Sequence, residues 1–262
     1  MEALLNTLRQ EYGICPDGIS HLEGYEDQTY LVMAGQERYI LKSQADCEGL
    51  KERICLEDRL TRSLDEQVAY EFPLHLSCKD GKRYFQINDR VYRLLTYLEG
   101  TFLAEVPAKD PILYSLGDLL GQLNRVSLGF RPGTLAGEVT SWDLQYLDSL
   151  HKYLLLVADP EDRALISYFL LQFRAEVLTR KHELRKALIH NDANDWNVLT
   201  QAGRVTGIID FGDMTCSWLI GELAVALPYV LADTTDPLLA ASKVIKGYHK
   251  RVPLEEQELS LL

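Results

Sequence analysis

The chain has 262 residues, of which 47% are apolar and 25% are charged, and its formal net charge is −12. This length can bury one large core or two smaller ones, and the ordinary composition excludes a disordered or fibrous protein. No apolar run reaches the roughly 18 residues that a membrane span requires, and no basic stretch suits nucleic acid, so neither is expected as a partner. The five cysteines are scattered without metal-ligand spacing, which predicts a reduced, cytoplasmic protein.

The first hundred residues predict a small β-rich lobe behind a short amphipathic helix at the N-terminus. Turn-forming pairs such as Asp80-Gly81 and Asn88-Asp89 separate short runs of apolar and β-branched residues. One further helix is expected from about Glu48 to Leu64. The predicted strands are His21–Glu26, Thr29–Ala34, Glu37–Ser43, Tyr84–Ile87 and Val91–Tyr97.

The pattern changes at Leu98-Glu99-Gly100, after which helical segments dominate. Helices are predicted over Pro111–Val126, Ser141–Ala158 and Glu161–Lys186. A short strand pair is expected around Val198–Gly212, with helix from there to the end of the chain. The predicted fold is α+β with two lobes: residues 1–97, a hinge at about 96–100, and an α-rich lobe over 98–262.

The strongest chemical signal is the segment His190-Asn191-Asp192-Ala193-Asn194-Asp195-Trp196-Asn197, followed by Ile208-Ile209-Asp210-Phe211-Gly212. Phosphoryl transfer needs one carboxylate to accept a hydroxyl proton and further oxygen ligands to hold Mg²⁺. Asp192 suits the base, while Asn197, five residues later, and Asp210, at a strand end, suit the metal. Alone, the first segment could be a loop rich in turn-forming Asn and Asp, but both halves together favour a kinase active site.

These two motifs resemble the aminoglycoside phosphotransferase and choline kinase superfamily, whose catalytic loop has the form HxDxxxxN followed by a DFG-like Asp. The likeness is strongest to the hydroxylysine kinase subgroup and also involves Gly24–Tyr30, Arg93–Gly100 and Asp210–Met214. It implies a protein-kinase-like fold over roughly Glu2 to Leu262, with Mg²⁺ as cofactor and ATP or GTP as co-substrate. The family usually has Gly where Asn191 stands, and Asn also tolerates left-handed backbone.

A lysine that anchors the nucleotide phosphates is expected at a strand end in the first lobe, and Lys42 fits, although a solvated lysine would look the same. Its acidic partner could be Glu52 or Glu57 on the following helix. At 100° per residue, Glu57 falls within the apolar face of that helix and Glu52 falls outside it. A carboxylate that points inward needs a partner to offset its desolvation, so we predict that Glu57 pairs with Lys42. The apolar face is formed by Leu50, Ile54, Leu56, Leu60 and Leu64.

The resemblance also implies where the nucleotide would bind. A turn over the nucleotide is expected at Tyr25, Asp27, Gln28 and Thr29, although this segment lacks the glycine-rich pattern of protein kinases. The backbone from Thr96 to Leu98 would contact the base. Two further residues are expected to support the catalytic loop: His190 as a brace, and Glu222 as a tie to a helix.

The acceptor implied by the resemblance is a small amino alcohol or hydroxy amino acid, with Trp142, Asp213 and Trp218 as candidates for its pocket. Carboxylates and an aromatic face would suit a cationic amine, but core packing would explain the tryptophans equally well. An aminoglycoside or other antibiotic phosphotransferase is the alternative enzyme, and a catalytically silent nucleotide-binding module is the alternative of another class. The helix-like start at Pro253 and the uncapped end at Leu262 predict a truncated chain, either a cloned domain or the front of a longer, fused polypeptide.

Overall fold

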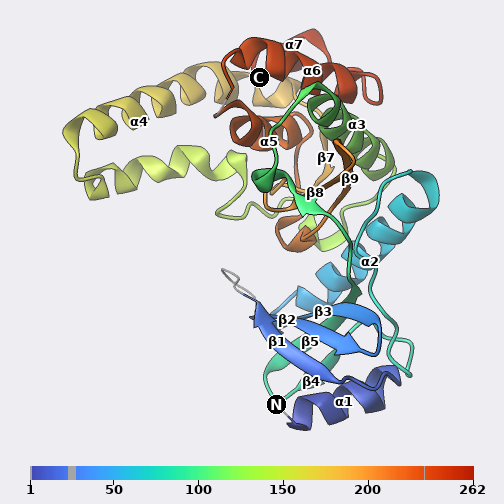
Figure 1. Cartoon of the computed structure of the whole chain (residues 1–262). Coiled ribbons are helices and arrows are strands. Elements are labelled where there is room, and N and C mark those ends of the chain that lie inside the picture. Colours follow the sequence, from blue (N-terminus) through green and yellow to red (C-terminus); the bar gives the residue numbers. More distant parts are fainter. Residues whose placement is uncertain (1, 23–27, 233) are drawn as a thin grey trace. The chain divides into compact units, whose positions relative to one another are not determined.

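The computed structural model describes residues 2–22, 28–232 and 234–262, and the chain divides into two compact units, Met1–Glu99 and Gly100–Leu262. The first unit is dominated by a sheet and the second by helices (Figure 1). Among the described residues, no helix is long and apolar enough to cross a membrane. All five cysteines are free thiols.

The N-terminal unit is built on one antiparallel sheet with the strand order β1-β2-β3-β5-β4. Two helices accompany the sheet: α1 (Glu2–Tyr12) and α2 (Leu50–Gln67). The strands are β1 (Gly18–Leu22), β2 (Gln28–Ala34), β3 (Glu37–Ala45), β4 (Phe85–Ile87) and β5 (Arg90–Thr96).

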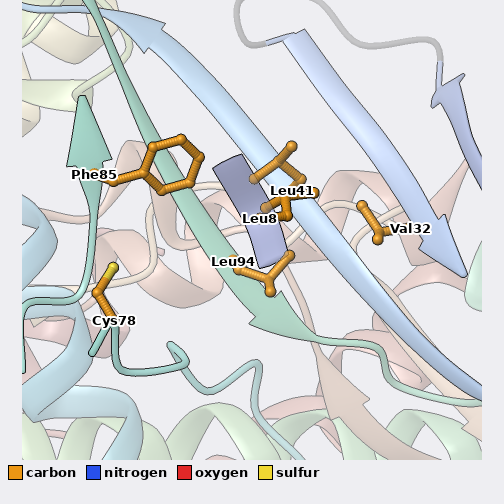
Figure 2. Packing of buried hydrophobic residues seen from close by; sticks show 6 residues of the cluster. All are labelled: Leu8, Val32, Leu41, Cys78, Phe85 and Leu94. Carbon is orange, nitrogen blue, oxygen red and sulfur yellow. The ribbon is translucent and has the colours of Figure 1, made fainter. Parts of the chain in front are cut away.

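Side chains alternate between the two faces of this sheet, and the alternation separates the core from the candidate site. Leu41 of β3 lies opposite Leu94 of β5, and both pack in one buried cluster with Leu8 of α1 (Figure 2). One residue further along, Lys42 lies opposite Arg93, so these two cations belong to the other face. That face receives α2, whose Leu50 and Ile54 pack against Val91.

The C-terminal unit combines two small sheets with most of the helices. β6 (Thr101–Phe102), β8 (Val198–Gln201) and β9 (Arg204–Ile208) form one sheet, and β7 (Lys186–Ile189) pairs with β10 (Thr215–Trp218) in the other. The α-helices are α3 (Asp110–Ser127), α4 (Pro160–Gln172), α5 (Gly221–Leu231), α6 (Pro237–His249) and α7 (Glu256–Leu259). The shorter helical elements are η1 (Leu103–Glu105), η2 (Gly133–Leu135), η3 (Leu144–Leu156), η4 (Phe173–Leu178), η5 (Lys181–Glu183) and η6 (Phe211–Asp213).

Two predicted helical stretches are wrong. The α-helix expected over 161–186 ends at Gln172, continues as one π-helical segment to Leu178, and gives way to strand β7 at Lys186. The helical tail expected after Gly212 instead begins with strand β10. Both strands are four residues long and largely buried, and such short apolar runs have no periodicity that distinguishes them from helix. These two segments are strands because they pair with each other in an antiparallel sheet.

Glycines allow α3 and α6 to approach each other closely (Figure 1). A Cβ atom at Gly117 of α3 would lie 1.8 Å from the carbonyl oxygen of Val244, and one at Gly247 of α6 would lie 2.2 Å from that of Tyr114. Any side chain larger than hydrogen would therefore force the two helix backbones apart. This contact places Tyr248, directly after Gly247, against α3.

Candidate active site

The predicted base, Asp192, lies in the loop between β7 and β8, where two amides hold its carboxylate. Asn194 Nδ2 donates to Oδ1 at 2.8 Å, and Asn197 Nδ2 donates to Oδ2 at 2.7 Å and to the Asp192 carbonyl at 2.9 Å. The Asn194 amide is itself oriented, because its Oδ1 accepts from the Trp196 N–H at 2.8 Å. Each carboxylate oxygen thus has a donor, which restricts the rotation of Asp192.

His190 braces the same loop. Its Nδ1 accepts the Asp192 N–H at 3.2 Å, so the proton of the neutral ring sits on Nε2, which lies 2.9 Å from the Ile209 carbonyl oxygen. The Phe211 ring packs edge-on against the imidazole, with 4.7 Å between ring centroids. Because both ring nitrogens are engaged within the protein, this geometry agrees with the expected bracing role of His190.

The two predicted metal ligands, Asn197 and Asp210, lie near each other because Ile209, the residue before Asp210, is bonded to the catalytic loop. The Ile209 N–H donates to the Asn197 carbonyl at 2.8 Å, and the Ile209 carbonyl oxygen lies 2.9 Å from the His190 ring. Asp210 follows in a left-handed conformation, with φ 65° and ψ 74°, and its carboxylate accepts from the Gly212 N–H at 3.2 Å. The loop geometry therefore brings an amide and a carboxylate to the same end of β9.

This pair has the right chemistry for Mg²⁺. Asn197 uses its Nδ2 on Asp192, which leaves Oδ1 as the side-chain atom that would ligate a cation. Together with Asp210 it supplies hard oxygen donors, and Mg²⁺ commonly takes only one or two protein ligands, the others being water and substrate phosphates. Among the described residues, no group of three or more His, Cys, Asp or Glu side chains could hold a metal without such added ligands.

Glu222 of α5 ties the catalytic loop to the helical core. Its carboxylate is fully buried and accepts the His190 N–H at 2.8 Å, the Asn191 N–H at 3.4 Å and Asn124 Nδ2 at 3.0 Å. Burial raises the pKa of Glu222, while these donors and the nearby His190 oppose that rise. Sequence reasoning found Glu222 but missed Asn124, because no motif spacing connects α3 to the loop.

In the N-terminal unit, the predicted helix phase agrees with the structure, since Glu57 is buried and Glu52 is exposed. The Glu57 carboxylate lies 3.7 Å from His75 Nε2 and 3.9 Å from Arg93 Nη2. Arg93 is the cross-strand neighbour of Lys42, so Glu57 approaches the sheet face to which Lys42 belongs. Lys42 itself is largely buried. The sequence did not identify Arg93 and His75 as neighbours of Glu57, because both residues lie on segments other than this helix.

The residues predicted to bind the nucleotide have varied surroundings. Tyr25 and Asp27 lie outside the described residues, and Gln28 and Thr29 begin β2, with Thr29 opposite Lys42. The Thr96 N–H donates to the Leu74 carbonyl at 3.0 Å, so it is not available to a base. In the described part of the chain, neither backbone group of Leu98 has a hydrogen-bond partner.

The three acceptor-pocket candidates also differ. Trp142 is 58% exposed, and its carbonyl accepts from Asn191 Nδ2 at 3.4 Å, which places its backbone beside the catalytic loop. Asp213 is partly exposed and follows Asp210 within η6. Trp218 is only 3% exposed and packs against Phe173, so its ring belongs to the core and offers no surface to an acceptor. Of the two possibilities left open for Trp218, its burial favours core packing over a place in the acceptor pocket.

A protein-kinase-like fold with this catalytic loop defines a phosphotransferase that acts on small molecules. The chain belongs to the phosphotransferase enzyme family, which matches residues 18–258. Hydroxylysine kinase of Mus musculus is 27% identical to it over 285 aligned residues, covering 96% of this chain and 75% of that relative.

Solved structures show the same fold. The amicoumacin kinase hAmiN, solved with AMP-PNP, Ca²⁺ and Ami, superposes with a TM-score of 0.76 at 18% identity, covering 99% of this chain and 82% of that one. A microcompartment-associated aminopropanol kinase has a TM-score of 0.68, also at 18% identity, covering 98% and 83%. The family, the fold class and the small-molecule kinase activity predicted from the sequence are thus confirmed.

Proposed function

We propose that this chain is an active Mg²⁺-dependent kinase that transfers the γ-phosphoryl group of ATP or GTP to a hydroxyl of a small amino alcohol or hydroxy amino acid. The observation that carries this proposal is the Asp192 carboxylate, both of whose oxygens accept a hydrogen bond from a fixed amide. A carboxylate held in this way presents its remaining lone pairs in set directions. It is suited to accept the proton of an acceptor hydroxyl as that oxygen attacks phosphorus.

The other residues have supporting roles in this proposal. Asn197 Oδ1 and the Asp210 carboxylate would hold Mg²⁺, which when bound supplies positive charge to the phosphate oxygens. Lys42 would contact the α- and β-phosphates, with Glu57 holding that lysine in place. The turn from Tyr25 to Thr29 would cover the nucleotide, and the backbone near Leu98 would contact the base within a hinge at 96–100.

The acceptor is proposed to carry an amine. The named substrates of two relatives, hydroxylysine and aminopropanol, each combine an amine with a hydroxyl. The net charge of −12 favours a cation over an anion, and the exposed Trp142 ring and Asp213 would suit an ammonium group. These features support an amino alcohol or hydroxy amino acid over a neutral sugar.

A phosphate-transfer assay tests the proposal. Purified protein is incubated with Mg²⁺ and either ATP or GTP against a panel of amino alcohols, hydroxy amino acids and aminoglycosides. We expect transfer to a member of the first two groups, and Asp192→Asn should lower kcat by roughly 10²- to 10⁴-fold with little change in nucleotide affinity. Asp162→Asn, which removes the same charge from α4, should match the wild type.

Three outcomes would contradict parts of the proposal. Transfer to aminoglycosides alone would replace the acceptor class. Nucleotide binding without transfer to any acceptor would indicate a silent binding module. Near-normal turnover in Asp192→Asn would remove Asp192 as the base.

A further inference from the structure

We infer that Asn124 and Tyr248 are positioning residues for the catalytic loop, acting through Glu222. A chain of hydrogen bonds runs from Tyr248 of α6 to Asn124 of α3, then to Glu222 of α5, and ends on the backbone of His190 and Asn191. Asp192 is the next residue. This inference rests on the proposed role of Asp192 as the base.

The last link of the chain fixes the backbone just before Asp192. His190 and Asn191 lie beyond the end of β7, and both direct their N–H groups to the Glu222 carboxylate. Asn191 adopts a left-handed φ of 67°, a conformation that Asn tolerates better than most non-glycine residues. Glu222 therefore accepts the backbone hydrogen bonds that the carbonyl groups of a neighbouring strand would otherwise accept.

The middle link depends on which way the Asn124 amide points. If its oxygen faced Glu222, two acceptors would meet without a proton between them. The Tyr248 hydroxyl prevents this by donating to Asn124 Oδ1 at 2.7 Å, which leaves Nδ2 to donate to Glu222 at 3.0 Å. All three residues have 0% exposure, so a bond lost here has no bulk water to replace it.

The first link exists because α6 and α3 touch at their glycines. A Cβ atom at Gly121 would lie 2.7 Å from the Tyr248 carbonyl oxygen, and Gly117 and Gly247 meet the facing backbone still more closely. With the two helix backbones this near, the Tyr248 ring extends along α3 to reach Asn124, seven residues beyond Gly117. The contact between these two helices is thus connected to the geometry of the active site.

Tyr248→Phe is the first test, because it removes one hydroxyl and keeps the ring that fills the core. We expect kcat to fall roughly 10- to 100-fold, as for a small misplacement of a reacting group, while the nucleotide KM stays within about twofold. The His190 and Asn191 amide protons should exchange faster with solvent in NMR. Tyr229→Phe removes the hydroxyl of a half-exposed tyrosine on α5 and serves as the matched control.

A second pair of variants distinguishes a positioning role from a general loss of stability. Asn124→Asp places a carboxylate against Glu222 and should lower kcat further than Tyr248→Phe. Adding Glu222→Gln exchanges the two groups: the introduced amide nitrogen, in place of Oε2, can donate to the introduced carboxylate, while the amide oxygen, in place of Oε1, can accept the Asn191 N–H. We expect the double variant to recover about tenfold in kcat over Asn124→Asp, together with amide protection at Asn191, whose acceptor oxygen is kept.

Either of two results would overturn the inference. In the first, Tyr248→Phe shows the same amide exchange at His190 and Asn191 as Tyr229→Phe. In the second, these amides exchange faster in Tyr248→Phe but kcat does not change. Amide exchange is measured without turnover. It therefore decides whether the hydrogen-bond chain holds the loop even if the proposed acceptor class is wrong, in which case the phosphate-transfer panel alone would fail.

Discussion

Two buried carboxylates in this protein are stabilised by different kinds of partner. Glu57 lies near a guanidinium and an imidazole, 3.9 Å from Arg93 and 3.7 Å from His75. Glu222 instead receives neutral donors, two backbone N–H groups and one amide. A carboxylate beside a cation can respond to what that cation binds, whereas one held by neutral dipoles serves to fix geometry. At the scale of the residue, Glu57 therefore lies beside a cation, as its proposed role next to Lys42 requires, and Glu222 holds the backbone of the loop.

The helix phase of α2 leads to a prediction about Lys42. Glu57→Gln should lower activity well beyond Glu52→Gln, because only Glu57 faces the buried cations. A double-mutant cycle with Lys42→Ala should give a coupling of about 0.5–3 kcal/mol for Glu57 and none for Glu52. Activity assays on the four variants of each cycle supply the measurement. Coupling through Glu52, or none through either glutamate, would contradict the pairing.

His75 should make folding stability depend on pH. Burial lowers the pKa of His75 below its ordinary value of 6.5, with Arg93 acting in the same direction and Glu57 and Asp58 opposing it. As pH falls below 6.5, the unfolded chain binds a proton at this residue while the folded chain does not, so stability is lost towards lower pH. The slope contributed by His75 reaches at most about 1.4 kcal/mol per pH unit.

Denaturant unfolding at several values between about pH 7 and 5 measures this effect. His75→Gln should flatten the dependence, whereas His182→Gln, at an exposed position, should leave the slope as in the wild type. An unchanged slope in His75→Gln would show that other groups account for the loss of stability in acid.

At the scale of the element, the contact between α3 and α6 is set by backbone rather than by side chains. Gly117 and Gly121 lie one turn apart on α3 and both meet the backbone of α6. This close approach buries Asn124 and Tyr248, whose hydrogen bond joins the two helices. The two helices therefore act as one support behind the catalytic loop.

Gly117→Ala should be strongly destabilising. The added methyl group would fall 1.8 Å from the Val244 carbonyl oxygen, which is backbone and cannot rotate away. We expect a loss of about 3 kcal/mol or more in the free energy of unfolding, measured by chemical denaturation. Gly18→Ala is the control, because its methyl group meets no atom within 4 Å and its φ is ordinary. A loss below about 1 kcal/mol at Gly117 would mean that the helices separate at little cost.

At the scale of the whole molecule, the residues assigned to the proposed reaction are divided between two separately packed units. The N-terminal unit holds Lys42 and Glu57, and the C-terminal unit holds Asp192, Asn197 and Asp210. The whole chain carries a net charge of −12, which acts over distances of a Debye length. Long-range attraction of the proposed cationic acceptor would depend on this total charge rather than on any single residue.

This charge predicts how the acceptor KM depends on salt. For an amine acceptor, KM should rise several-fold between about 0.05 M and 0.5 M monovalent salt, because screening weakens the attraction. The N-acetylated form of the same acceptor is the control and should show little change in KM. Equal salt dependence for both forms would argue against an amine-binding site.

The class of reaction and the local geometry of this protein could be predicted from the order of its residues. The spacing from Asp192 to Asn197 and the later Asp210 identified a phosphotransferase, and the 3.6-residue period of α2 distinguished buried Glu57 from exposed Glu52. Such features depend on residues near one another in the chain, where the sequence spacing sets the directions in which the side chains point.

Contacts between residues far apart in the chain could not be predicted in this way and are seen in the folded structure alone. Asn124 contacts Glu222 across 98 positions and Tyr248 across 124, and neither separation leaves a local pattern. In the same way, β7 and β10 are strands because they pair with each other, and Trp218 is a core residue because Phe173 packs on it. These contacts form between separate elements, so they depend on how helices and strands pack, which residue spacing along one element does not specify.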